Sequence, residues 1–351
     1  MRRNRWQTWL ITMIWVAFLA VLNSCNNQAA PDVSHIPVTI EIERFDQFMF
    51  EKWDTADQGR SITDLYTAFP TFSSDFIVNV IGLPGFDPAI PDSAKALTFS
   101  EMKRFIRLTK PLYDSLSSRF SNIQHVEEEL SQAFKYVRYY FPDYTIPKVI
   151  SFLGPFDAPG IAITGDALGI GLQLYAGKNF SFYNSPQGID LYPMYISRRF
   201  EPKYIPVNAM KAVIEDLFPG KTQGGSLIEQ IIENGKQWYL LDKFLPVTPD
   251  SLKTGYTQQQ LAWCEQNEGL IWNFLLQTND IYTTEPMFIK TFIGESPTTE
   301  GMPSSAPGNI GQWIGWQIVK KYHVQVSGSE PATIMNLDAK QVFSRSKYRP
   351  K

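Results

Sequence analysis

The chain has 351 residues, of which 44% are hydrophobic and 19% are charged. This composition supplies enough apolar side chains for one large core or two smaller ones, and it excludes general disorder. The formal net charge is −3, which argues against a nucleic-acid binder that works through a basic surface. Two cysteines cannot form a disulfide framework, and three histidines leave few ligands for a metal site.

The first 24 residues have the organisation of a bacterial signal peptide. Three arginines make its start positive, and residues 10–22 are apolar except for Thr12. A helix of this length rises about 20 Å, which is less than the ~30 Å hydrocarbon core of a bilayer. We therefore expect a signal peptide at residues 1–24, with an uncleaved membrane anchor as the alternative.

Residues 22–25, at the end of this apolar stretch, resemble the lipobox of bacterial lipoproteins. In such proteins the cysteine, here Cys25, is acylated and becomes the first residue of the mature chain. The resemblance implies that lipid chains on Cys25 anchor the protein to a bilayer, since stable anchoring takes more than one chain. The alternative is an ordinary secretory signal with a coincidental cysteine.

The rest of the chain shows no internal repeat and no long linker. Residues 25–36 are mostly polar or small, and we predict that they form a flexible tether. We predict a single domain at residues 37–351. From about residue 339 the chain has five basic residues and no acidic one, so we expect this part to be a loose basic tail.

The domain is predicted to combine few strands with many helices. Short alternating or β-branched runs predict strands at 37–45, 148–153, 160–164 and 168–175. Apolar residues spaced by three and four predict helices at 61–69, 100–110, 121–141, 207–218, 226–245, 257–275 and 310–323. Strands and helices do not alternate regularly, so we predict an α+β fold that is predominantly helical with a small sheet.

Polar residues mark the starts of three of these helices. Ser226 with Glu229 and Thr257 with Gln260 have the spacing of a capping box, in which two side chains bond the free N–H groups of a helix start. Asn309 is of a residue type that caps helices, and we predict that it caps the helix that follows it.

The helix at 310–323 has two glycines, Gly311 and Gly315, one turn apart. In an apolar helix this spacing would suggest association within a membrane, but the glutamines and lysines of this segment exclude a span. Each helical glycine costs about 1 kcal/mol relative to alanine, and close packing must offset that cost. We therefore predict that another part of the chain packs closely against these glycines.

The sequence contains none of the motifs of common catalytic or metal sites. His35, His125 and His323 are far apart, so no His-Glu-x-x-His pair is present to bind zinc. The Gly-x-Ser-x-Gly motif of serine hydrolases and the phosphate-binding glycine loop are also absent. Cys264 stands beside Glu265, which would raise the pKa of its thiol, and we predict a packed thiol. We predict no catalytic residue, no metal and no cofactor.

Carboxylates and aromatic residues leave other interpretations open. Glu229 and Glu233 lie one turn apart, an arrangement that suits either a carboxylate-based hydrolase or a solvated helix face. The aromatic-rich residues 175–204 end near Arg198 and Arg199. These rings either stack on sugars while the arginines bind an anion, or they pack a long irregular segment onto the core.

Three segments resemble the GldB family of gliding-motility lipoproteins: residues 134–142, residues 255–274 and residues 307–322. The resemblance covers nearly all of the mature chain, and the last two segments are distinctive. It implies a lipoprotein of the cell envelope that is associated with gliding motility, a property of whole cells rather than a reaction. The uncharged residues 26–29 after the lipobox cysteine favour a location that faces the periplasm.

A second likeness concerns the fold. Strands near 148–175 followed by helices at 207–218 and 226–245 look like the order in thermolysin-like metallopeptidases. The first helix has no histidine here, and Glu233 or Asn234 stands where that family has a glutamate ligand. The likeness implies a degenerate metallopeptidase scaffold that has lost its metal.

We therefore predict a non-catalytic, lipid-anchored protein that faces the periplasm and binds a partner from the envelope or the motility apparatus, but no nucleic acid. The alternatives are a metal-independent hydrolase and a solute-binding lipoprotein, acting on peptidoglycan, sugar or peptide ligands. The predicted binding surface is a groove between residues 168–175 and Glu233. Its candidate residues are Tyr175, Arg198, Arg199, Glu233 and Asn234.

Overall fold

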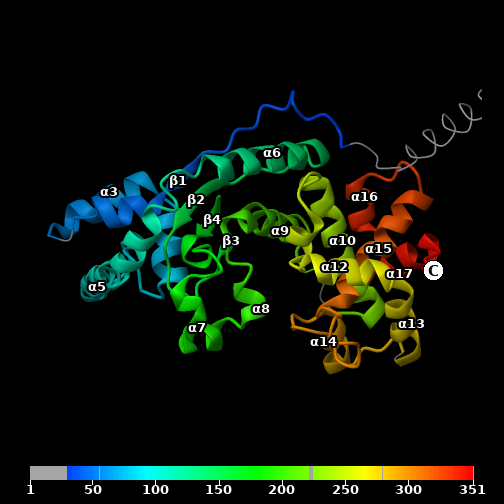
Figure 1. Ribbon diagram of the computed structural model, residues 1–351. Coiled ribbons are helices and arrows are strands. Elements are labelled where there is room, and N and C mark those ends of the chain that lie inside the picture. Colours follow the sequence, from blue (N-terminus) through cyan, green and yellow to red (C-terminus); the bar gives the residue numbers. More distant parts are fainter. Residues whose placement is uncertain (1–29, 55, 221–223, 279, 351) are drawn as a thin grey trace, which may run out of the picture. The chain divides into compact units, whose positions relative to one another are not determined.

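The computed structural model describes residues 30–350, apart from 55, 221–223 and 279 (Figure 1). The signal peptide and Cys25 lie outside the described residues. Within them, the chain from Val33 onward forms one compact unit with many helices and a four-stranded sheet, which confirms the predicted α+β fold. No helix in this part of the chain is both long enough and apolar enough to cross a bilayer.

The sheet contains parallel and antiparallel strands. β2 is parallel to both β1 and β4, whereas β3 is antiparallel to β4. All of β4 and all but the first residue of β2 are buried, because both faces of these central strands are covered. The order across the sheet is β1 (Ile42–Arg44), β2 (Lys148–Phe152), β4 (Ala167–Gly171) and β3 (Ile161–Thr164).

Helices that precede and follow the strands pack around the sheet and build the first hydrophobic cluster. Figure 1 shows α6 passing over the strands, and α9 contacts β3 and β4. Side chains of this first cluster come from α2 (Phe45–Gln47), α3 (Gln58–Ala68), α4 (Phe72–Asp75), α5 (Asp92–Ser117), α6 (Gln124–Tyr140) and α9 (Ile205–Leu217). The short helices α7 (Pro186–Leu191) and α8 (Met194–Ser197) lie between β4 and α9 in the chain.

The remaining helices build a second hydrophobic cluster. α10 contributes to both clusters: its first part, up to Tyr239, belongs to the second cluster, and Leu240, Leu241 and Phe244 belong to the first. The helices that contribute to the second cluster are α10 (Leu227–Phe244), α12 (Gln258–Gln266), α13 (Glu268–Thr278), α14 (Pro286–Ile293), α15 (Ile310–Gln325), α16 (Pro331–Asn336) and α17 (Ala339–Ser346). The exception is α11 (Asp250–Thr254), whose Leu252 packs against the first cluster.

Only the end of the strand predicted at 37–45 forms, as β1. Side chains of α6 bind the backbone N–H groups of this segment in place of another strand. The N–H of Ile40 donates to Ser131 Oγ at 2.8 Å, and that of Ile42 donates to Glu127 Oε1 at 2.8 Å. Because these donors are already satisfied, the segment does not extend the sheet.

Two predicted helices have different limits in the structure. α3 begins before Ser61, because the Asp57 side chain accepts from the N–H of Arg60 at 3.0 Å and caps the helix there. α5 continues through Pro111, which is exposed, so water can bond the carbonyl that the proline leaves without a donor.

The predicted capping boxes of α10 and α12 are both confirmed. The prediction that Asn309 caps α15 is wrong. Its backbone is left-handed, with φ of 56°, and its side-chain Nδ2 donates to Gln312 Oε1 at 2.7 Å instead of the side chain accepting from the helix start. The helix predicted at 257–275 is divided at Asn267, whose side chain bonds the carbonyl of Trp263 at 2.8 Å and ends α12.

The glycines of α15 pack closely against α10, as predicted. A Cβ atom added at Gly315 would lie 1.8 Å from the carbonyl oxygen of Ile231, and one added at Gly235 would lie 2.1 Å from the carbonyl carbon of Gly315. A Cβ at Gly311 would lie 2.9 Å from the carbonyl oxygen of Phe292. Gly235 and Gly315 therefore set how closely α10 and α15 approach, and Gly311 allows α14 to lie close to α15.

The prediction of a loose tail from about residue 339 is wrong. Residues 339–346 form α17, which contacts α15 and α10, and Val342 and Tyr348 are buried. The Tyr348 hydroxyl donates to Glu268 Oε1 at 2.6 Å. At the other end of the domain, Val33 was assigned to the tether but is buried in the first cluster. Apolar contacts therefore fix both segments despite their polar composition.

Candidate functional site

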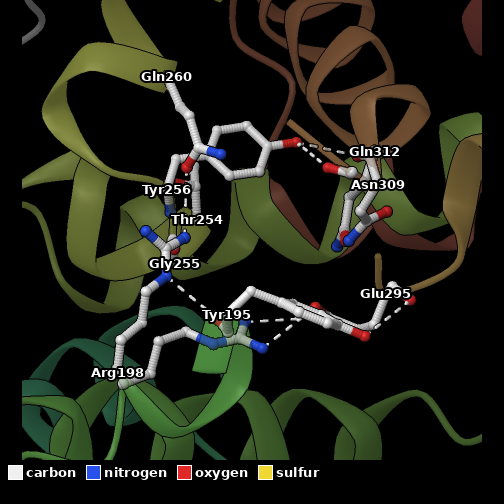
Figure 2. Close-up of polar contacts among 11 residues, drawn as sticks. Tyr195, Arg198, Thr254, Gly255, Tyr256, Gln260, Glu295, Asn309 and Gln312 are labelled. Carbon is white, nitrogen blue, oxygen red and sulfur yellow. Dashed lines mark hydrogen bonds and ion pairs between the residues drawn. The ribbon is translucent and has the colours of Figure 1, made fainter. Parts of the chain in front are cut away.

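A small polar pocket lies where the segment after α8 meets the loops that precede α12 and α15 (Figure 2). The loops bring together residues that are up to about a hundred positions apart in the sequence. Its volume is about 20 Å³, enough to hold a water molecule. The side chains that matter most for its chemistry belong to Tyr195, Arg198, Arg199, Gln260, Glu295 and Asn309.

Local backbone structure places the two arginines side by side. α8 is a single turn that begins after Pro193, and the N–H groups of Arg198 and Arg199 bond the carbonyls of Met194 and Ile196. Gly255 ends α11 with a left-handed φ of 73°, and a Cβ there would lie 2.8 Å from Arg199 Nη1. Glycine at this position therefore allows the guanidinium to approach the backbone.

Arg198 is held by three hydrogen bonds. Its Nε donates to the carbonyl of Tyr195 at 3.1 Å, and its Nη2 donates to the carbonyl of Gly255 at 2.8 Å and to Gln260 Oε1 at 3.2 Å. Burial, followed by the neighbouring Arg199, lowers the pKa of the Arg198 guanidinium. Arg198 therefore fixes the geometry of the pocket wall and adds positive charge to it.

Arg199 forms a two-pronged ion pair with Glu295. Nη1 and Nη2 donate to the two carboxylate oxygens at 3.2 Å and 3.1 Å. The Arg199 side chain is only 19% exposed, whereas that of Glu295 is 55% exposed. The arginine is thus a fixed part of the wall, and the carboxylate reaches it from the solvent side.

A third cation, Lys211 of α9, adds to the charge of this region. It interacts electrostatically with both Arg199 and Glu295. Burial, followed by the charge of Arg199, lowers the pKa of the Lys211 ammonium to about 8. In the part of the chain that the structure describes, no carboxylate lies within ion-pair distance of Lys211. Arg198, Arg199 and Lys211 therefore outnumber Glu295 by three charges to one.

Asn309 places a polar atom without a partner at the other side of the pocket. Its Oδ1 is buried and has no hydrogen bond to any residue within the described ranges. The hydroxyl of Tyr256 holds the loop by donating to the carbonyls of Gly308 and Asn309 at 3.0 Å and 3.1 Å. Gln312 Nε2 donates to the carbonyl of Asn234 at 3.2 Å and connects the loop to α10.

The prediction of a groove between residues 168–175 and Glu233 is wrong. The segment from β4 to Tyr175 is buried, and the Tyr175 hydroxyl accepts from Asn208 Nδ2 at 3.0 Å inside the first cluster. Glu233 pairs with the buried Lys236 of its own helix at 2.7 Å. The Asn234 side chain bonds the carbonyl of Gln230, one turn earlier. The structure therefore brings Arg198 and Arg199 together, but not with the other three candidates.

The two carboxylates one turn apart on α10 also have separate structural partners. Glu229 closes the capping box of Ser226, whose hydrogen bonds lower the pKa of the Glu229 carboxyl. It also pairs with Lys340 of α17 at 3.4 Å. Since Glu233 pairs with Lys236, each carboxylate is bound to a different part of the second cluster.

The described part of the chain contains no cluster of metal ligands and no reactive thiol. There, no three His, Cys, Asp or Glu side chains converge as metal ligands would. His323 bonds the Tyr239 hydroxyl at 3.1 Å. Cys264 is fully buried, and burial, followed by Glu265, raises the pKa of its thiol to about 12. The predicted packed thiol is confirmed.

A larger hollow lies between the end of α6 and the start of β2. Its volume is about 890 Å³, and it is lined by Tyr140, Phe141, Tyr144, Ile163 and Leu217 among others. None of the five candidate binding residues predicted from the sequence borders it. Its charged lining residues are Asp143, Lys148, Asp166 and Asp216.

Sequence reasoning missed Glu295, Lys211 and the role of Gln260 in this pocket. Gln260 was recognised as a helix cap, and the structure shows that its Oε1 accepts from Thr257 N–H at 3.0 Å as well as from Arg198. The adjacent arginines were the signal in the sequence that pointed to this place. Nothing in the local sequence around Glu295 connects it to residues about a hundred positions earlier.

Comparison with known proteins identifies the family. The model of the family described as gliding motility protein GldB matches residues 26–350, nearly the whole chain. No curated protein and no solved structure is significantly similar to it, and the thermolysin-like likeness stays a prediction. The match includes all the segments in which the resemblance was noted. The chain therefore belongs to the GldB family of gliding motility proteins.

Proposed function

We propose that this protein is a non-catalytic, lipid-anchored component of the cell envelope that acts in gliding motility by binding a partner protein. Family membership supports the association with gliding motility and the lipoprotein class. The observation that carries partner binding is the arginine pocket, in which Arg198 and Arg199 are accompanied by one partly exposed carboxylate, that of Glu295. Arginines held in a fixed position are typical anchors of protein interfaces.

The surface next to the pocket supports a polypeptide partner. In the segment just before the arginines, Met194 is 66% exposed, and Ile189 and Leu191 are 41% and 40% exposed. Methionine, tyrosine and arginine are enriched in the centres of protein interfaces. Apolar side chains beside a charged pocket would give a partner both buried area and orientation.

Crosslinking in intact cells tests whether this surface binds a partner. We expect a photo-reactive residue in place of Met194 to give a specific adduct with one envelope protein, and Arg199→Gln to reduce that adduct and colony spreading. A photo-reactive residue in place of Val324, which is 69% exposed on α15, is the control and is expected to give no such adduct. Identical adducts from both positions, or normal spreading with Arg199→Gln at normal abundance, would contradict the proposal.

The lipid anchor has a separate test. Replacing Cys25 by alanine removes the thiol that the lipobox presents for acylation, so we expect the protein to leave the membrane fraction or to remain unprocessed. Fractionation of cells followed by mass determination of the N-terminus measures both outcomes. Unchanged membrane association of a processed Cys25→Ala protein would contradict lipid anchoring, without bearing on the pocket.

A further inference from the structure

The arginine pocket is built to receive a negatively charged group. Arg199 is mostly buried, and it presents both Nη1 and Nη2 toward the solvent side, where Glu295 binds them. Arg198 uses Nε and Nη2 for the protein backbone and Gln260, which leaves its Nη1 without a partner among the described residues. Lys211 adds a further charge. The wall therefore carries more positive charge than Glu295 neutralises.

The ion pair between Arg199 and Glu295 can be replaced by one between Arg199 and another carboxylate. Glu295 lies in the loop after α14, and more than half of its side chain is exposed. Its backbone carbonyl is bonded only at long range, by the Tyr195 hydroxyl at 3.4 Å. The Glu295 carboxylate already contacts water, so it can leave when another carboxylate takes its place on the mostly buried Arg199.

We propose that the pocket binds a carboxylate of an acidic segment of the partner polypeptide, and that Glu295 occupies that place on Arg199 when no partner is bound. This inference rests on the proposed function and gives the chemistry of its partner. The partner's carboxylate would accept from both Nη atoms of Arg199, as Glu295 does, and the charge of Lys211, which interacts electrostatically with Glu295, would favour it further.

Two observations favour a polypeptide carboxylate over a phosphate or a lipid headgroup. The group that binds Nη1 and Nη2 of Arg199 in the structure is itself the carboxylate of a protein side chain, that of Glu295. The exposed apolar side chains beside the pocket, including Met194, suit the side chains that flank an acidic residue in a protein.

The test measures binding of fluorescein-labelled oligo-L-glutamate to the full-length protein by fluorescence anisotropy. Because Glu295 competes for the same site, Glu295→Gln is expected to raise the affinity about tenfold. Arg199→Gln is expected to lower the affinity about tenfold, and Lys211→Met is expected to lower it less. Glu300→Gln and Arg107→Gln change the net charge equally at exposed positions, and both are expected to leave the affinity unchanged.

Equal effects of Glu295→Gln and Glu300→Gln would overturn the inference, since net charge alone would then explain the gain. Normal binding by Arg199→Gln would overturn it as well. Tighter binding to phosphatidylglycerol vesicles or to inorganic phosphate than to oligo-L-glutamate, lost in Arg199→Gln, would assign the pocket to a phosphate group instead. Melting temperatures verify folding of each variant, and Lys211→Met provides a second test if Glu295→Gln is poorly folded.

These results are separable from the proposed function. Oligo-L-glutamate binding with the expected variant pattern but no adduct from position 194 in cells would support the carboxylate site and contradict the partner surface. A specific adduct in cells without any oligo-L-glutamate binding would support the partner surface and overturn the carboxylate site.

Discussion

Replacing Gly315 by alanine is expected to lower the free energy of unfolding by at least about 3 kcal/mol, at the upper end of overpacking effects. The new Cβ would lie 1.8 Å from the carbonyl oxygen of Ile231, and both atoms belong to well-packed helices. Relief requires α10 and α15 to separate, which would open the centre of the second cluster. Gly235→Ala places a Cβ on the α10 side of the same helix contact and is expected to lower the free energy of unfolding by a similar amount.

Urea unfolding followed by circular dichroism measures this effect. Gly59→Ala is the matched control, because Gly59 is also in a helix but its added Cβ would have only Asp57 Oδ1 nearby, at 3.8 Å. We expect it to be neutral or to stabilise the protein by up to about 1 kcal/mol, the helix propensity difference. Equal costs for Gly59→Ala and Gly315→Ala would show that the crossing is not tightly packed.

Replacing Asp242 by alanine is expected to cost about 3 kcal/mol, the lower end of the range for breaking a buried ion pair, because its side chain is 23% exposed and Lys253 keeps Asp250 as a partner. Asp242 of α10 accepts from Lys253 Nζ at 2.5 Å and from Trp316 Nε1 at 2.7 Å. Lys253 is only 5% exposed, and Lys320 stacks on the Trp316 ring at 3.7 Å. Removal of the carboxylate leaves a buried ammonium and a buried indole N–H poorly compensated.

Asp250→Ala is the control for this substitution. Asp250 also pairs with Lys253, at 2.7 Å, but its side chain is 43% exposed. Exposed ion pairs are worth at most about 1 kcal/mol, so the loss should be small. The free energies of unfolding from urea titrations decide between the two. A larger loss for Asp250→Ala than for Asp242→Ala would refute the importance of burial at this ion pair.

Local signals in the sequence predicted much of the second half of the fold. The spacing of Ser226 with Glu229 and of Thr257 with Gln260 located two helix starts, because a capping box is made within four residues. Gly311 and Gly315 predicted a close helix contact, since glycine in a helix needs a compensating interaction. Which helix packs against these glycines depends on the tertiary fold, so α10 could not be identified as the partner from local sequence.

Errors arose where tertiary contacts overrode composition. The five basic residues after position 339 suggested a loose tail, yet Ala339, Val342 and Ser346 recur at the spacing that buries one face of α17. Net charge says little about packing when a few apolar residues share one face. The strand at 37–45 was shortened because α6 provides its hydrogen-bond acceptors, an interaction across about 90 residues.

The candidate site was predictable only in part. Arg198 and Arg199 are adjacent, so the sequence reveals a local concentration of charge. Their partner Gln260 comes from the first turn of α12 and Glu295 from the loop after α14, and only the tertiary fold brings them to the arginines. Tyr175 was chosen as a groove residue for its aromatic ring, but aromatic rings are as well suited to a core, where the structure places it.

The membership of α10 in both hydrophobic clusters makes the two halves of the domain energetically inseparable. Its first turns hold the glycine crossing with α15, and its last turn inserts Leu240, Leu241 and Phe244 into the cluster around the sheet. Loss of packing in either half would expose apolar side chains of α10 to water. Heat or denaturant should therefore melt the domain in one cooperative step, with the amide protons of α10 among the slowest to exchange.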